Sequence, residues 1–226
     1  MRPGKFHSIQ ALAERHHGAA GVKARLTELR AANGTDLNQS DDRFLSGMTK
    51  AVFSSGFSWS VVEQKWPGFE AAFDGFDPHR VAFYADEDMT RLLKDTRIIR
   101  NGGKIAATIA NARFVVETAE KHGSFAAFLK GWPPSDQVGL MDHFKQNAAR
   151  LGGSSVMYFL RFSGWDAFIL NADVTKALIR DGVIDKAPTS KAQLRAVQDA
   201  FNAWTKESGR PQREVSRILA LSVGPS

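Results

Sequence analysis

The stretch Ser54-Ser55-Gly56-Phe57-Ser58-Trp59 decides the fold, because it predicts a sharp turn between two helices. Gly56 adopts a positive φ without steric cost, so it can end a helix that runs from about residue 43. A second helix follows over residues 58–73. The sequence therefore predicts a helix–turn–helix corner with Trp59 beside the turn.

Capping signals support the second helix of this corner. Ser58 or Ser60 can cap it, and Glu63 stands at the capping-box spacing from Ser60. Pro67 fits the first turn of a further helical piece. Six aromatic side chains surround the turn: Phe53, Phe57, Trp59, Trp66, Phe69 and Phe73. They form either a hydrophobic core or a binding surface.

Apolar residues recur at helical spacing along the rest of the chain, and few stretches alternate with period two. We predict helices at these places: 7–33 (two short helices, interrupted at Gly18 and Gly21), 78–82, 86–94, about 101–121, 124–130, 136–149, 154–163, 173–181, 190–207 and 211–222. Residues 33–36 form a predicted turn. The fold class is therefore all-α.

Composition limits the classes of protein that this chain can be. With 226 residues and 43% hydrophobic content, it can bury the core of one domain, with or without two lobes. It has no apolar run long enough for a membrane span, no signal-peptide pattern at its N-terminus, and no cysteine, so we expect a cytoplasmic protein. The net charge of +6 and the pI near 9.7 favour a polyanionic partner.

Two glycine pairs precede predicted helices. Gly152 and Gly153, followed by Ser154 and Ser155, allow a tight hairpin whose free amides suit a phosphate oxygen, although an ordinary helix–helix turn has the same sequence. The second pair precedes Lys104 and lacks the spacing of a nucleotide-binding P-loop.

Several blocks, taken together, resemble the DNA-3-methyladenine glycosylase I family of the helix-hairpin-helix glycosylases. They are Ser55–Trp59, Phe69–Phe73, Phe76–Pro78, Asp95–Ile105 and Asn111–Arg113, with weaker matches at 152–155 and 170–174. The resemblance covers about residues 50–180 and is dense over 51–113. It implies a two-lobed helical helix-hairpin-helix fold in a single domain over residues 1–226.

The resemblance also implies an activity, which is hydrolysis of the N-glycosidic bond of alkylated purines such as 3-methyladenine. The damaged nucleotide is rotated out of double-stranded DNA into an aromatic pocket. That pocket is expected to contain Phe53, Ser54, Phe57, Trp59 and Tyr158, although backbone partners can equally satisfy a buried tyrosine. The DNA backbone is expected to contact the hairpin residues Gly152, Gly153, Ser154 and Ser155, together with Lys104.

Two departures from the family pattern concern the base-binding residue and a metal site. The family carries a glutamate eight residues before the pocket tryptophan, and this chain has Ala51 there. Without cysteine the chain cannot build the family's structural zinc site, so we expect no zinc and no required cofactor. The divergent helical segment at 1–42 replaces that tether, and residues 43–226 form the family-like core. A monovalent cation often binds the hairpin in this family.

Asn171 and Asp173 are the candidate catalytic residues. Asn171 matches the position where many superfamily members carry a catalytic aspartate, and the 3-methyladenine family itself has asparagine there. Asp173 is an alternative acid at the start of a helix, where it can instead be the N-cap. No lysine occupies the position beside the hairpin that lyase relatives use for Schiff-base chemistry, so the resemblance implies a monofunctional enzyme. We expect a monomer, which is the default for an enzyme that must wrap a duplex.

Three hypotheses follow from these features. The first is a DNA glycosylase. The second is a lesion-binding protein with weak or no catalysis, which the alanine at position 51 favours. The third is a helical protein that no longer binds DNA.

Overall fold

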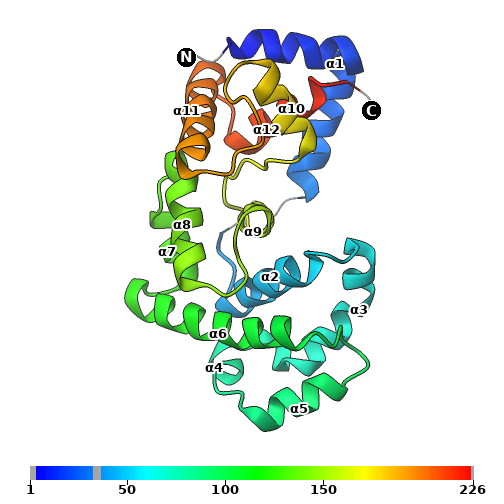
Figure 1. Ribbon diagram of the computed structural model, residues 1–226, viewed down its shortest axis with the longest axis vertical. Helices are drawn as coiled ribbons and strands as arrows, with labels where there is room; N and C mark the ends of the chain where they lie inside the picture. Colours follow the sequence, from blue (N-terminus) through cyan, green and yellow to red (C-terminus); the bar gives the residue numbers. More distant parts are fainter. Residues whose placement is uncertain (1–3, 33–36, 225–226) are drawn as a thin grey trace. The chain divides into compact units, whose positions relative to one another are not determined.

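The computed structural model describes residues 4–32 and 37–224, which form α-helices and short 3-10 helices (Figure 1). No strand occurs in these residues, so the predicted all-α class is confirmed. The turn predicted at residues 33–36 lies outside the described residues. None of the helices in the described ranges combines the length and the apolarity that a membrane span requires.

The chain divides into two compact units, and we describe each by itself. Unit 1 contains residues 1–35, 133–140 and 160–226, and unit 2 contains residues 36–132 and 141–159. Two helices, α8 (Gln137–Asn147) and α9 (Ser154–Phe162), contribute residues to both units. The single domain predicted for the whole chain stays a prediction.

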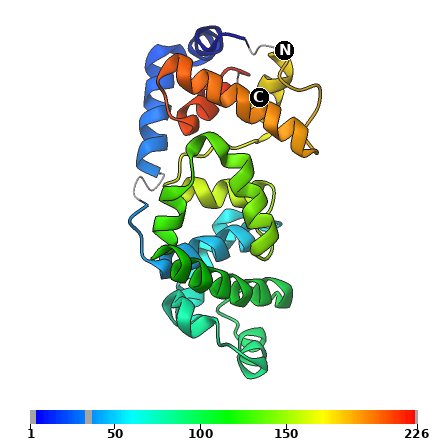
Figure 2. The same ribbon diagram turned by 90° about the vertical axis from the view of Figure 1, so that its left-hand side faces the viewer.

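Unit 1 is a group of helices in which α1 packs on α12 and α11 (Figure 2). Its helices are α1 (Phe6–Ala32), η2 (Pro134–Asp136), α10 (Ala172–Arg180), α11 (Lys191–Ser208) and α12 (Gln212–Leu221). The predicted division of the first segment into two helices is confirmed, because Gly18 has φ 70° and ψ 153° and breaks α1 in the middle. The interruption predicted at Gly21 is absent, because Gly21 lies within the second helical half of α1.

The core of unit 1 holds the N-terminal helix in place. Phe168 stacks on Phe201 with ring centroids 4.4 Å apart, and the Trp204 indole N–H donates to the carbonyl of Gly4 at 2.8 Å. On the other side of α1, a guanidinium nitrogen of Arg30 lies 2.6 Å from the buried carboxylate of Glu214, which Arg210 also contacts at 3.0 Å. These contacts fix both halves of α1 to unit 1.

Unit 2 is arranged around a long central helix, α6, against which α2, α4, α5 and α7 pack. Its helices are α2 (Asp41–Ser54), α3 (Trp59–Ala72), η1 (Asp74–Phe76), α4 (Pro78–Val81), α5 (Asp86–Lys94), α6 (Gly102–His122) and α7 (Phe125–Gly131). Side-chain caps set several helix starts, since the side chains of Ser58, Asp77, Asn101 and Ser124 each accept a hydrogen bond from a first-turn amide. Ser58 is one of the two caps predicted for α3.

The corner between α2 and α3 forms as predicted, with Gly56 at φ +83° in the turn. Two local predictions there are wrong. Ser58 is the cap, and Ser60 lies inside the first turn, so the box between Ser60 and Glu63 is absent. Pro67 lies inside α3 and does not start a new helix, because buried side chains before and after it hold one continuous helix against the core.

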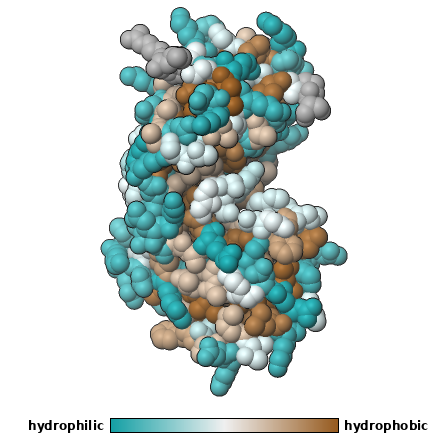
Figure 3. Space-filling model, in the orientation of Figure 1, coloured by the Kyte–Doolittle hydropathy of each residue, from teal (hydrophilic) through white to brown (hydrophobic). Residues whose placement is uncertain are grey.

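Most of the aromatic cluster at this corner is core. The rings of Phe53, Phe69 and Phe73 are fully buried, and Trp66 stacks on Phe69 with centroids 5.1 Å apart. Polar and charged residues cover much of the surface, with apolar patches between them (Figure 3). At the corner itself, Phe57 and Trp59 stay exposed.

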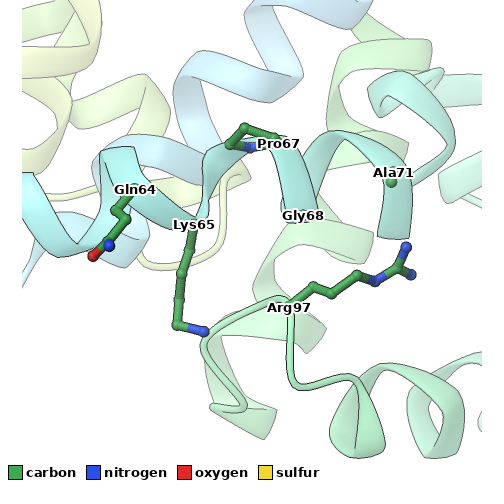
Figure 4. Close-up of a pocket in the computed structure, with 6 residues that line it drawn as sticks. All are labelled: Gln64, Lys65, Pro67, Gly68, Ala71 and Arg97. Carbon is green, nitrogen blue, oxygen red and sulfur yellow. The ribbon is translucent and has the colours of Figure 1, made fainter.

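The helix α3 also packs closely on the loop before α6. Figure 4 shows Gly68 of α3 beside Arg97 of that loop, in a pocket that Lys65 also lines. A Cβ placed on Gly68 would lie 2.5 Å from the carbonyl oxygen of Arg97. The Lys65 ammonium donates to the Thr96 carbonyl at 2.9 Å and fixes the same loop.

We predict that Gly68→Ala destabilises the protein by about 1–3 kcal/mol, because the added methyl group must displace backbone and not a flexible side chain. Gly131→Ala is the matched control, since a Cβ there has no atom within 4 Å. Both substitutions raise helix propensity, so the two variants differ in the contact of the new methyl group with the Arg97 backbone. Urea unfolding of the two variants measures the effect, and equal midpoints would refute it.

Candidate functional site

Lys104, in the first turn of α6, is the residue that joins the parts of the candidate site. Its side chain is buried, and its ammonium donates to the carbonyls of Phe53 at 3.1 Å and Ser55 at 2.5 Å. The same nitrogen lies 4.6 Å from the ring centroid of Phe57. It therefore satisfies carbonyls that the end of α2 leaves without a helical donor. Its ammonium is thus used inside the protein, and the expected contact of Lys104 with the DNA backbone stays a prediction.

Two exposed aromatic side chains stand on the corner that Lys104 fixes. Phe57 is 42% exposed and Trp59 is 38% exposed. Tyr158 of α9 lies beside Trp59, with ring centroids 5.9 Å apart at 62°. The structure thus brings together three of the five predicted pocket residues at a surface where a flat ligand can stack.

The other two predicted pocket residues are buried. Phe53 is fully buried, packs edge-on against Phe69 at 4.6 Å, and supports the corner from behind. Its expected contact with the base stays a prediction. Ser54 is 9% exposed, and its hydroxyl oxygen is buried without a hydrogen-bond partner. Ala51, at the family's glutamate position, is 5% exposed.

Glu70 of α3 connects the two helices of the corner by a network of hydrogen bonds. Its carboxylate accepts two from Arg43, at 2.9 and 3.0 Å, one from Ser46 at 3.1 Å and one from the Trp66 indole at 3.1 Å. Burial opposes ionisation of Glu70, but these donors and the charge of Arg43 outweigh it and hold the pKa of this carboxyl below its ordinary value. Glu70 is therefore an ionised structural group.

The hairpin lies where the sequence predicts it, between α8 and α9. Gly152, Gly153 and Ser154 are exposed, and Gly153 has φ +55°. Ala149, in the loop before the glycine pair, is held by Asn111 of α6. The side-chain oxygen of Asn111 accepts from the Ala149 N–H at 2.7 Å, and the side-chain amide of Asn111 donates to the Ala149 carbonyl at 3.1 Å. Asn111 is fully buried. The backbone-binding role of the hairpin stays a prediction.

Asn111 is a functional candidate that sequence reasoning missed. The sequence shows it as the first residue of a block that resembles the family and as a polar residue on the buried side of the long helix, without a role of its own. Because a buried carboxamide needs partners, that position is itself the signal that a loop packs there.

The two candidate catalytic residues belong to unit 1. Asn171 is the N-cap of α10, and its side-chain oxygen accepts from the Val174 N–H at 2.8 Å. The alternative role of Asp173 as that cap is therefore wrong. Asp173 stands in the first turn, with its side chain 42% exposed and 3.7 Å from the Lys176 ammonium. In the residues that the structure describes, no three His, Cys, Asp or Glu side chains are placed to hold a metal ion.

Comparison with known proteins gives matches of three kinds. The family model described as methyladenine glycosylase matches residues 34–156. DNA-3-methyladenine glycosylase 1 of Escherichia coli (strain K12) is 40% identical over 75 residues, which are 33% of this chain and 40% of that protein. The match thus spans less than half of that relative's length.

Solved structures extend the comparison to the fold. A 3-methyladenine DNA glycosylase I is similar with a TM-score of 0.51 and 28% identity, over 59% of this chain and 81% of its own. The 8-oxoguanine DNA glycosylase of Thermotoga maritima is similar in fold, with a TM-score of 0.54 and 17% identity over 95% of both chains. The predicted helical helix-hairpin-helix glycosylase fold is confirmed.

We predict that Glu70→Gln lowers the free energy of unfolding near neutral pH by about 1–2 kcal/mol, because the charge-assisted bonds to Arg43 are lost. The pKa of Glu70 is lowered by folding, so this stabilisation is complete above its ordinary pKa of 4.5 and disappears as the pH falls through the folded value. Denaturant titrations of both proteins between pH 3 and 7 measure the gap. A gap that does not shrink as the pH falls below 4.5 would contradict this.

We predict that Asn111→Ala costs about 2–4 kcal/mol, because it leaves the N–H and carbonyl of Ala149 without partners at a half-buried position. Hydrogen exchange at the Ala149 amide should accelerate in this variant. Asn147→Ala is the control, since the Asn147 amide donates a single bond on an exposed helix surface and should cost little. Equal effects of the two substitutions would show that the hairpin does not depend on Asn111.

Proposed function

The chain belongs to the methyladenine glycosylase family, and from this premise we propose that it hydrolyses the N-glycosidic bond of an alkylated purine in double-stranded DNA. The substrate that we propose is 3-methyladenine, the base named in its relatives. The single observation that carries the proposal is the exposed pair Phe57 and Trp59, which stands on a corner fixed from below by Lys104.

The chemistry requires the protein to bind and orient the nucleotide more than to activate it. Alkylation at N3 gives the purine a positive charge, which makes the base a good leaving group. Water adds to the sugar carbon and loses a proton, while the bond to the base breaks and its electrons neutralise the leaving purine. Stacking of the cationic base on Trp59, with Tyr158 beside it, contributes roughly 1–2 kcal/mol.

The catalytic roles of Asn171 and Asp173 belong to this proposal. Asp173 has a half-exposed carboxylate, which is able to stabilise positive charge on the sugar or accept the proton of the attacking water. The cap uses only the side-chain oxygen of Asn171, which leaves its amide nitrogen as a donor. We propose hydrolysis without a lyase step, by a monomer that requires no cofactor, with a monovalent cation at the hairpin.

A second candidate function is lesion binding without base release. The buried Ala51 supports it, because an alanine offers no charge to a cationic base. This candidate keeps the aromatic surface and the hairpin, and differs only in its product.

We predict that the wild-type protein releases 3-methyladenine from methylated duplex DNA and that Trp59→Ala slows this release roughly tenfold or more, because the stacking platform is lost. Trp59→Phe keeps a ring and should retain most of the rate. Chromatography of the released bases measures this. Lesion binding without release, lost in Trp59→Ala, would establish the second candidate; neither release nor binding by the wild type would refute both.

A further inference from the structure

Arg150, in the loop before the hairpin glycines, has an unusual backbone and a free side chain. Its φ is +57°, a left-handed conformation that side chains other than glycine seldom adopt. Its residue is exposed, and the structure gives its guanidinium no hydrogen bond or ion pair with any residue in the described parts of the chain. Nothing inside unit 2 therefore accounts for the position of this charge.

The surroundings of Arg150 are positively charged. A terminal nitrogen of its guanidinium lies 2.7 Å from the place that a Cβ on Gly103 would occupy, at the start of α6. The N-terminal end of a helix disfavours a cation. Lys104 follows Gly103 in the sequence. Burial of the Lys104 ammonium, together with the charge of Arg150, lowers the pKa of Lys104. Two cations and a helix N-terminus thus meet here.

The loop leaves Arg150 little freedom to relax. Asn111 holds Ala149 at both its N–H and its carbonyl, and Leu151 on the other side is 1% exposed. The conformation of Arg150 is therefore imposed by its neighbours. Such enforced backbone conformations occur at functional sites, where the fold maintains a geometry that a ligand needs.

We propose that the guanidinium of Arg150, which lies against Gly103 at the start of α6, binds a phosphate of the DNA backbone from its exposed side. The proposal rests on the proposed function and adds a phosphate-binding side chain that neither the hairpin glycines nor the buried Lys104 supplies. Gly103 is part of it, because any side chain there would occupy the place of the guanidinium.

The test is the affinity for an undamaged, fluorescently labelled duplex, measured by anisotropy at several salt concentrations between 50 and 200 mM. Arg150→Gly should weaken binding roughly tenfold. It should also reduce the slope of log affinity against log salt by about 0.9, which is the value for one phosphate contact. Its melting temperature should stay level or rise, because glycine accepts this backbone conformation and a like-charge contact is removed.

Lys121→Ala is the matched control. Lys121 is an exposed cation in the last turn of the same helix, about 27 Å from Gly103 at 1.5 Å per residue. Its removal subtracts the same charge and should leave the slope nearly unchanged. Gly103→Ala is a second variant, because it displaces the guanidinium while keeping the arginine. It should weaken binding in the wild type and have no further effect in Arg150→Gly.

The outcomes separate this proposal from the proposed function. Unchanged affinity and slope in Arg150→Gly, in a protein whose wild type releases base, would overturn the role of Arg150 alone. A drop in melting temperature with unchanged binding would assign Arg150 a structural role and overturn it as well. A wild type that binds duplex in an Arg150-dependent way but releases no base would uphold the contact and refute the glycosylase.

Discussion

The buried ammonium of Lys104 is the interaction on which the candidate site depends. A helix that ends inside a protein leaves carbonyl oxygens without donors, and in unit 2 the end of α2 meets this need with a lysine from another helix. The same nitrogen faces the ring of Phe57. One charge therefore fixes the end of α2, the turn after it and the start of α6. Removal of this charge would affect the exposed aromatic surface both through the turn and through the lost contact with Phe57.

The corner shows how one sequence motif serves packing and binding together. Phe53, Phe69 and Phe73 are the buried members of the aromatic cluster, while Phe57 and Trp59 follow Gly56 and stay at the surface. The two exposed rings lie in the turn and at the first residue of α3, whereas the buried rings lie in α2 before the turn and near the end of α3 after it. The core interpretation is confirmed for the buried residues, and the binding-surface interpretation stays a prediction for the exposed pair.

The helices were predictable because their ends carry strong local signals. Ser124 and Gly123 bound α7 and α6, and Asp77 with Pro78 starts α4, through contacts within a few residues. Long-range contacts were not predictable in the same way. The partners of Lys104 lie 49 and 51 residues away, so the sequence indicated an exposed lysine where the structure has a buried one. Pro67 likewise marked a helix start, but tertiary burial of α3 outweighed it.

The grip of Asn111 on Ala149 has a consequence for how this loop can vary in length. The Asn111 side chain binds both the N–H and the carbonyl of Ala149, so it fixes the position of this one residue in the loop. Residues inserted between α8 and Ala149 would bulge outward and leave the glycine pair in place. Residues inserted between Ala149 and Ser154 would shift the register of the hairpin. The number of residues between Ala149 and the start of α9 therefore determines where the hairpin lies. In relatives with a longer loop between these two helices, we expect the extra residues between α8 and the position of Ala149.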